Sequence, residues 1–283
     1  MSQWTGKSYG GYWGNLCFLK LLKLGLAPAY VLLAFVAAYF MVFRRRACAG
    51  AVEFLSRVNG RKVGAFSAET YKLLFTFGAC LLDRTSVMLG ESKITLRDEC
   101  RATLEDAMSD GRGVVVLTAH VGGWAAAGTK LSEYGREVVV LGADRENPEL
   151  QKLAESARKI DAPKIFDDGS LGYVEAYAAL KRGAIVAIHA DRYAGGRFAE
   201  AEFFGSKVKA PTAAFSLAKT AKVKAVQIIC TREKKFEYAM RASEVFDPAK
   251  TPPDDCARAF MKNLETALRK YKYQWFNFYD FWN

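Results

Sequence analysis

Short apolar runs alternate with segments of helical composition from residue 114 onward, and this alternation leaves few folds open to the chain. The first run, Val114–Ala119, is continuous and β-prone and is entered through a turn signal at Asp110–Gly113, as expected for a strand buried on both faces. Strands separated by helices form βαβ units. We therefore predict an α/β domain with a largely parallel central sheet and helices on both of its faces. The predicted strands are 114–119, 137–141, 163–166, 184–190, 200–204 and 223–230, and the predicted helices are 124–134, 148–160, 172–182, 211–221 and 254–271.

Residues 47–109, ahead of this alternation, have mainly helical composition. Ser67–Leu82 is a long stretch with apolar periodicity, and Thr95–Asp98 has the form of a capping box that would open a helix running to Met108. No repeat, low-complexity tract or long linker interrupts the sequence after residue 46. We therefore expect residues 47–283 to form one domain.

The amino-terminal region predicts contact with a membrane. Leu24–Phe43 has no charged residue over about the length that crosses a hydrocarbon core, and Arg44–Arg46 follows it directly. Because Gly25 and Pro28 interrupt its first turns and positive charge flanks both ends, three arrangements stay open: a spanning helix, a tilted or half-inserted helix, and a buried helix packed on the domain core. We expect residues 1–46 to associate with a membrane and the arginines to favour anionic headgroups on its cytosolic side.

The composition narrows the class of partner. The net charge of +11 indicates an anionic partner, which is nucleic acid, an acidic membrane surface, or a substrate that bears phosphate or an acidic carrier. The basic residues are dispersed, and an uncharged segment of this length has no purpose in nucleic-acid binding, so we expect no nucleic-acid partner. Six scattered cysteines with no CxxC pair, and only two histidines, indicate neither a metal site nor a disulfide framework.

The run from His120 to Ala125 is the clearest candidate for chemistry. His120 ends the first predicted strand, Gly122 and Gly123 permit a tight turn, and a predicted helix begins at Trp124. Open α/β sheets bind ligands at this edge, where backbone N–H groups hold a phosphate or an oxyanion and an imidazole takes a proton near neutral pH. The structural alternative is a partly buried, hydrogen-bonded histidine beside a glycine turn.

Three further clusters, at residues 142–148, 189–196 and 203–212, follow or end predicted strands. We expect them at the same sheet edge as His120. Taken singly, each also has an ordinary structural interpretation, as a solvated loop residue, a local ion pair, or core aromatics. His189 lies inside a strand pattern, which favours packing in the interior. We predict that Asp191 acts with His120 in catalysis in this crevice. The residues that we predict to bind substrate there are Gly122, Gly123, Trp124, Arg145, Asn147, Arg192 and Phe204.

On these residues the chain resembles the lysophospholipid acyltransferase superfamily, and within it the lipid A late acyltransferases and related predicted acyltransferases. The resemblance lies in the hydrophobic amino terminus and in the segments His120–Trp124, Arg145–Pro148, Asp191–Arg192, Phe203–Gly205 with Pro211, and Tyr273–Phe278. It implies a protein at the cytoplasmic face of a bacterial inner membrane that moves an acyl chain from acyl carrier protein or coenzyme A to a hydroxyl or amine, with no bound cofactor or metal. It also implies His120 as the general base and Arg145 or Arg192 as a partner for phosphate or the thioester oxyanion.

The sequence departs from the family at one position. The family pattern is His, four residues, then Asp or Glu, but the fifth residue after His120 is Ala125. Three explanations stay open: an inactivating substitution of the acid at 125, another acid such as Asp191 or Asp144 that orients His120, or a catalytically silent lipid binder.

The leading hypothesis is a membrane-associated acyltransferase in which the amides at Gly122 and Gly123 and an arginine stabilise the oxyanion. Apolar residues of the amino-terminal helix and of 47–109 would line the acyl groove, and the basic surface would suit acyl carrier protein and anionic lipids. The alternative is a noncatalytic lipid-binding protein of the same fold. The aromatic tail Tyr271–Trp282 is expected to cover the sheet edge or to lie at the bilayer interface.

Overall fold

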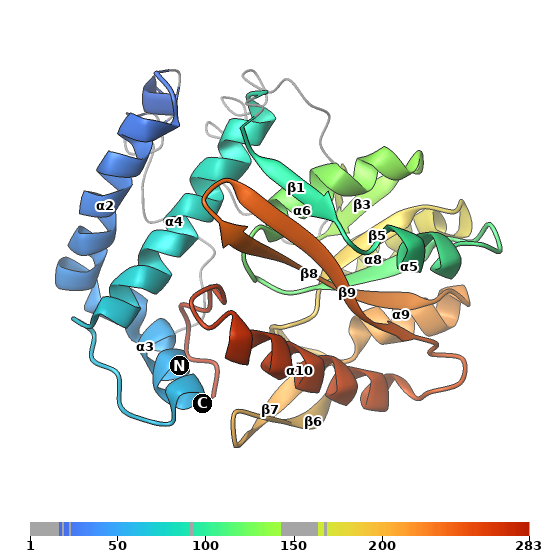
Figure 1. Ribbon diagram of the computed structural model, residues 1–283. Coiled ribbons are helices and arrows are strands. Elements are labelled where there is room, and N and C mark those ends of the chain that lie inside the picture. The colour runs from blue at the N-terminus through green and yellow to red at the C-terminus, as the bar shows by residue number, and fades with distance from the viewer. Residues whose placement is uncertain are drawn as a thin grey trace.

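The computed structural model describes residues 17–18, 20–22, 24–90, 93–142, 164–166 and 169–282. Within them, seven strands form one sheet in the order β1-β9-β8-β2-β5-β3-β4. Figure 1 labels β1, β9, β8, β5 and β3 of this sheet. Every pairing is parallel except that of β8 with β9, so β9 and β1 run against the other five strands. The predicted largely parallel sheet is confirmed. The strands are β1 Thr95–Asp98, β2 Val114–Thr118, β3 Val138–Leu141, β4 Lys164–Phe166, β5 Ile185–His189, β8 Ala225–Lys234 and β9 Glu237–Phe246.

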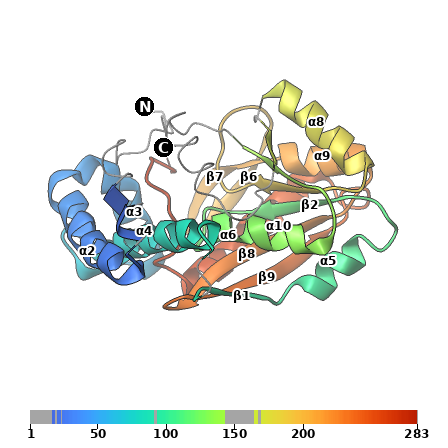
Figure 2. The ribbon, with the colours of Figure 1, turned by 90° about the horizontal axis from the view of Figure 1, so that it is seen from above.

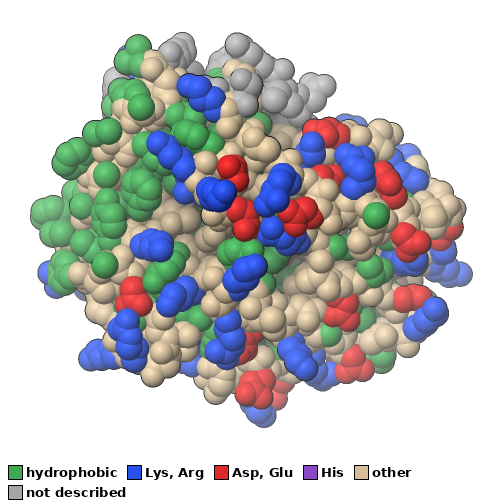
Figure 3. Space-filling view, in the orientation of Figure 1, with side chains coloured by type: hydrophobic (Ala, Val, Ile, Leu, Met, Phe, Trp, Pro, Cys, Tyr) green, Lys and Arg blue, Asp and Glu red, His purple; other side chains and the backbone are tan. Residues whose placement is uncertain are grey.

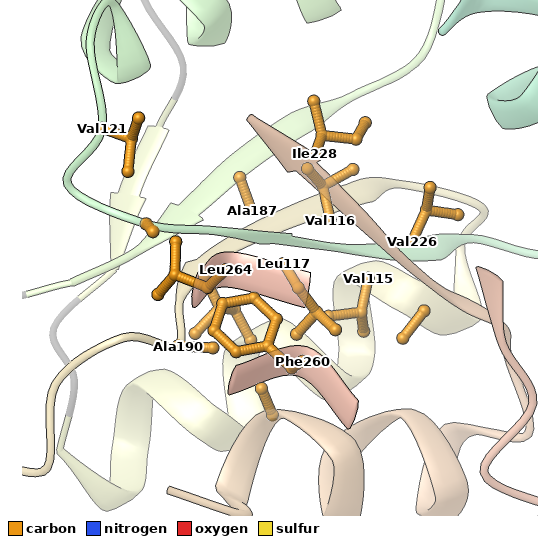
Figure 4. Packing of buried hydrophobic residues seen from close by; sticks show 14 of the residues in the cluster. Val115, Val116, Leu117, Val121, Ala187, Ala190, Val226, Ile228, Phe260 and Leu264 are labelled. Atoms are coloured by element: carbon orange, nitrogen blue, oxygen red, sulfur yellow. The ribbon is translucent and has the colours of Figure 1, made fainter. Parts of the chain in front are cut away.

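Helices cover both faces of this sheet, as predicted. Figure 4 shows the alternation that makes this possible: Val116 and Ile228 lie on one side of β2, whereas Val115 and Leu117 lie on the other side with Phe260 of α10. Successive side chains of a strand point to opposite faces, and apolar residues at both therefore need a helix on each face. The helices are α5 Arg101–Ala107, α6 Trp124–Leu131, α8 Ser170–Lys181, α9 Ala213–Ala221 and α10 Pro253–Lys270, and the 3₁₀ turn Ser132–Tyr134 follows α6.

A separate two-stranded sheet packs on α10. It consists of β6 Phe198–Phe203 and β7 Ser206–Pro211, which pair antiparallel. Phe204 and Gly205 form the two-residue turn between them, with φ of 49° and 73°, as a tight hairpin turn of this kind requires. The prediction of one strand at 200–204 was incomplete, because residues 206–211 form a second strand before the helix.

Two other predictions need correction. Thr95–Asp98 is not a helix-capping box but strand β1, which pairs in parallel with β9 from Thr95↔Glu237 to Asp98↔Met240. The helix that was expected to begin there starts at Arg101. Strand β9 was not predicted, and the predicted helix 148–160 lies outside the described residues.

Three helices, α2 Leu26–Phe43, α3 Arg45–Asn59 and α4 Ala68–Met88, lie at one end of the molecule beside the sheet (Figures 1 and 2). One stripe of α2 is buried and includes Leu33, whose side chain fits against Gly78 of α4, where an added Cβ would lie 2.1 Å from it. The opposite stripe is exposed, at 61% for Val31 and 70% for Phe35, and forms the apolar patch over α2 in Figure 3. Helix α2 is long and apolar enough to cross a membrane, yet 22% of it is buried in the protein.

Candidate active site

The turn after β2 is held on two sides by distant parts of the chain. Gly122 has a φ of 54°, and a Cβ there would lie 2.3 Å from the carbonyl oxygen of Cys230 in β8. A Cβ on Gly123 would lie 2.6 Å from the ring of Tyr238 in β9. Both positions therefore require glycine, and the close approach fixes the place of His120 at the sheet edge.

His120 and Asp191 come together because β2 and β5 are neighbours. Their register pairs Thr118 with His189, so the residues two positions further along each strand direction also lie side by side. His120 Nδ1 is 2.9 Å from Asp191 Oδ1, and the backbone N–H of His120 donates to Asp191 Oδ2 at 3.1 Å. The Asp191 side chain is fully buried, whereas 19% of the His120 side chain is exposed. A buried carboxylate thus holds an imidazole that still faces the outside.

The electrostatics of this pair favour one protonation state. Burial opposes ionisation of Asp191, but His120, its hydrogen bond and the Arg192 guanidinium together outweigh burial and hold the pKa of the carboxyl well below its usual range. Burial lowers the pKa of His120, and the opposing effect of Asp191 does not reverse that shift. Because an ionised carboxylate only accepts hydrogen bonds, neutral His120 carries its proton on Nδ1 and presents an Nε2 lone pair. This is the form that a general base requires.

The second histidine stacks on the first. The ring centroids of His120 and His189 are 4.2 Å apart with an interplanar angle of 26°. Burial, and next the electrostatic effect of the adjacent His120, lower the pKa of His189 to about 3, so this imidazole is neutral. The prediction that His189 packs in the interior agrees with this arrangement, although its stacking places it directly against the candidate base.

Three residues of types that bind metals meet in this cluster. The ligand atoms of His120, His189 and Asp191 lie within 4.8 Å of one another. The two imidazole planes are nearly parallel, however, so their in-plane lone pairs do not converge on one point. Both oxygens of Asp191 also accept hydrogen bonds already. The geometry fits proton transfer better than metal binding.

Position 125 lies in the first turn of α6, and alanine there has no carboxylate to offer. The acid that contacts His120 in the structure is Asp191, which the sequence analysis raised as one alternative. Asp144, the other acid considered there, lies outside the described residues, as do Arg145 and Asn147.

The amides of the glycine turn were expected to bind the oxyanion. The Gly122 N–H donates to the carbonyl oxygen of Gln274 at 2.8 Å, and the Gly123 N–H donates to that of Cys230 at 2.8 Å. Both N–H groups therefore already have backbone acceptors, and the expectation that they bind the oxyanion stays a prediction. Arg192 lies close enough to His120 and Asp191 to lower the pKa of both, and it donates to the carbonyl oxygen of Phe276 at 2.7 Å.

The two aromatic residues of the predicted site differ in position. Trp124 lies against His120, with ring centroids 5.8 Å apart, and lines a small cavity between α6 and the sheet. Phe204 is buried in the hairpin turn and packs edge-on against Phe54 at 5.6 Å, so it occupies a core position. The expectation that Phe204 contacts substrate has no support in this packing.

The cavity beside Trp124 has a volume of about 40 Å³. Its lining comes from α6 and the sheet, including His189, Gly128 and Met240, and none of it comes from the amino-terminal helix or residues 47–109. It holds a few water molecules at most and has no room for a fatty chain as it stands. A larger groove of about 470 Å³ lies between α8 and α9 and is lined by none of those predicted site residues that the structure describes.

One residue of the site was not predicted. Trp275 is fully buried and donates its indole N–H to Asp191 Oδ2 at 3.0 Å. The aromatic tail was expected to cover the sheet edge or to lie at the bilayer interface, and no local pattern pairs position 275 with position 191.

Comparison with known proteins gives one family. The family model described as bacterial lipid A biosynthesis acyltransferase matches residues 90–283. Among solved structures, the 1-acyl-sn-glycerophosphate acyltransferase PlsC from Thermotoga maritima is similar at 12% identity, covering 86% of this chain and 94% of that one, with a TM-score of 0.39. A search of the curated proteins found no match.

Proposed function

Because this chain belongs to the bacterial lipid A biosynthesis acyltransferase family, we propose that it moves a fatty acyl chain from a thioester of acyl carrier protein or coenzyme A to a hydroxyl or amine of a lipid or lipid-like acceptor. His120 is the general base. The observation that carries this proposal is the hydrogen bond between His120 Nδ1 and the buried Asp191 carboxylate, at 2.9 Å. It leaves a basic nitrogen on a partly exposed imidazole at the ligand-binding edge of the sheet.

The reaction follows from this arrangement. His120 Nε2 removes the proton from the acceptor as its oxygen or nitrogen attacks the thioester carbonyl. Asp191 stabilises the imidazolium that forms, as the acid of a catalytic triad does. The tetrahedral intermediate then expels the thiolate, which takes the proton from His120. Arg192, the described cation whose charge reaches His120, offsets the negative charge that develops on the carbonyl oxygen.

Asp191 takes the place of the acid that alanine cannot supply at position 125. The family pattern puts the acid on the helix after the histidine, whereas this chain has an acid at the end of β5 that contacts His120 Nδ1. Under this proposal the chain is an enzyme and not a silent relative. The alternative, a noncatalytic lipid-binding protein of the same fold, keeps Ala125 as its support.

We place the protein at the cytoplasmic face of a bacterial inner membrane, with α2 lying in the surface of the bilayer. The buried stripe of α2 runs from Leu26 to Ala37, so the helix packs on α4 over most of its length. If α2 crossed the bilayer, α4 with Lys72 and Arg84 would enter the hydrocarbon beside it, which is costly for charged side chains. A half-inserted α2 buries its exposed apolar stripe and leaves Arg44–Arg46 at the anionic headgroups.

The proposal divides the chain at residue 46 and assigns it two kinds of anionic partner. Residues 1–46 serve as the membrane-associating segment, and residues 47–283 form the catalytic domain. The net charge of +11 favours acyl carrier protein, which is strongly acidic, as the donor partner, and also favours anionic lipids.

The experiment compares acyl transfer by the full-length protein and by His120→Ala, from acyl carrier protein and coenzyme A thioesters, in vesicles that contain anionic lipid and a lipid extract. Product is identified by mass spectrometry. We expect transfer by the wild type and a loss of at least about 10³-fold in His120→Ala. If neither the wild type nor Ala125→Glu transfers an acyl group from either donor while both bind lipid, the noncatalytic alternative stands instead.

A further inference from the structure

We infer that Trp275 is a positioning residue of the active site, whose indole N–H locks the Asp191 carboxylate in the orientation that faces His120. The effect of Trp275 on kcat rests on the proposed function. Its effect on which nitrogen of His120 carries the proton does not.

The carboxylate is held at both oxygens. Oδ1 faces His120 Nδ1 at 2.9 Å, and Oδ2 accepts from the His120 backbone N–H at 3.1 Å and from Trp275 Nε1 at 3.0 Å. The terminal torsion of an aspartate side chain has broad energy minima, so its orientation depends on its hydrogen-bond partners. Trp275 supplies the one indole donor among these contacts, and the site is buried, with Asp191 and Trp275 at 1% and 0% exposure.

Trp275 is itself fixed by packing. Its ring lies edge-on to Phe54 at 4.9 Å, to Phe203 at 5.4 Å and to Phe281 at 5.0 Å. Each partner comes from a different part of the chain, namely α3, β6 and the carboxyl-terminal segment. A ring enclosed on several sides has no alternative rotamer to adopt, so the N–H direction is set before substrate binds.

The backbone around Trp275 is joined to the backbone around His120. Val121 forms a bridge with Trp275, the Gly122 N–H donates to Gln274 O at 2.8 Å, and the Phe276 N–H donates to His120 O at 2.9 Å. The indole and the imidazole therefore keep a fixed relation to one another. The carboxyl-terminal segment acts as part of the site and not only as a cover for the sheet edge.

Removing the N–H should loosen the carboxylate, which keeps its two hydrogen bonds to His120, without emptying the core. In Trp275→Phe an aromatic ring remains between Phe54 and Phe203, but Oδ2 loses a charge-assisted hydrogen bond. We expect kcat to fall about 10- to 100-fold with little change in KM, because the interaction supports the imidazolium that forms only in the transition state. We also expect His120 to lose its single tautomer, so that a fraction carries the proton on Nε2.

The chain offers a direct readout and a matched control. It contains only two histidines, so nitrogen-15 labelling of histidine gives two imidazoles whose tautomers are read by nuclear magnetic resonance. Trp282 belongs to the same aromatic cluster, with its ring centroid 5.9 Å from that of Trp275. It donates its own indole N–H to the carbonyl oxygen of Phe203 at 3.3 Å. Trp282→Phe loses an equivalent donor that does not reach Asp191, and it should leave kcat and the His120 tautomer as in the wild type.

A second variant guards against a packing effect. Replacing Trp275 with 3-benzothienylalanine puts sulfur in place of the N–H and keeps the bicyclic ring, so it should reproduce both changes. The inference is overturned if this variant keeps the wild-type tautomer and kcat, or if Trp282→Phe alters them equally. Should the wild type transfer no acyl group, the proposed function fails, but the tautomer measurement still decides the role of Trp275.

Discussion

Two buried carboxylates, Asp191 and Asp83, resemble each other in their surroundings and differ in what they can do. Both are about 1% exposed, and each lies near an arginine. Asp83 accepts from the hydroxyl groups of Tyr30 and Tyr238 at 2.6 Å each and pairs with Arg232 at 3.3 Å. Burial depth therefore does not separate a structural acid from a functional one.

The partners separate them. Burial raises the pKa of Tyr238 further above its usual range, and an arginine stays charged at any physiological pH, so nothing around Asp83 gains or loses a proton near neutrality. Asp191 instead faces His120, an imidazole that is 19% exposed and whose neutral form has a lone pair that can take a proton. Asp83 instead joins α2, α4 and the strands β8 and β9 into one body.

The largest expected effect comes from Asp191→Asn. Its side-chain amide can donate to His120 Nδ1 and would shift the imidazole proton to Nε2, which removes the basic lone pair. Since the equivalent change in a serine-protease triad costs about 10⁴ in kcat, we expect a loss of about 10³- to 10⁴-fold here, with a thermal midpoint near that of the wild type. Initial rates and a melting curve check this, and a variant that retains a tenth of the activity would remove Asp191 from the mechanism.

Asp83→Ala should have the opposite pattern. It leaves the largely buried Arg232 without its carboxylate, and breaking a buried pair in this way costs about 3–5 kcal/mol of unfolding free energy. The activity of the protein that remains folded should be unchanged. Urea denaturation measures the first quantity, and rates corrected for the folded fraction measure the second. Adding Arg232→Met should recover part of the stability, whereas a loss of kcat as large as that of Asp191→Asn would erase the contrast between the two acids.

The pH dependence of the unfolding free energy tests whether His189 is held neutral in the native state. Burial and the electrostatic effect of His120 lower the pKa of His189 to about 3 in the native state. In the unfolded chain this imidazole takes up a proton at about pH 6.5, whereas in the native state it stays neutral. The unfolding free energy should therefore fall as pH falls from about 6.5 toward 3, by about 1.4 kcal/mol per pH unit from this group. Denaturation of the wild type and His189→Phe at about pH 7 and about pH 5 compares the slopes. Equal slopes would mean that His189 is not held neutral.

Several of these features follow from local sequence, and others do not. The apolar runs ending at Thr118 and His189 predicted two strands with His120 and Asp191 at the same edge. Their contact depends on β2 and β5 being adjacent and in register, which no local pattern encodes. Thr95–Asp98 has a local capping pattern, but pairing with β9, more than 130 residues later in the sequence, overrode it.

In the glycine turn, too, the local sequence predicts the backbone shape but not the hydrogen-bond partners. Its sequence correctly predicted a tight turn after His120, but not that Gln274 and Cys230 would take the two amide N–H groups. Trp275 lies 84 residues from Asp191, and only the folded chain brings its indole to the carboxylate. Local patterns located His120 and Asp191, whereas Gln274, Cys230 and Trp275, which contact the turn and the carboxylate, come from distant segments.

The smallest change in kcat is expected at position 125, where a new acid would compete with Asp191 for His120. Ala125→Glu restores the family's acid, yet His120 Nδ1 already pairs with Asp191 and the imidazole has no second N–H to offer at that nitrogen. We therefore expect kcat to change by less than about threefold, which is within 1 kcal/mol of transition-state free energy. The matched test adds Ala125→Glu to the Asp191→Asn background, where any recovery measures how far an acid on α6 can replace one at the end of β5. A tenfold or larger rise in kcat for Ala125→Glu alone would mean that Asp191 binds His120 but does not support its role as a base. The wild-type chain would then lack the acid of the family pattern.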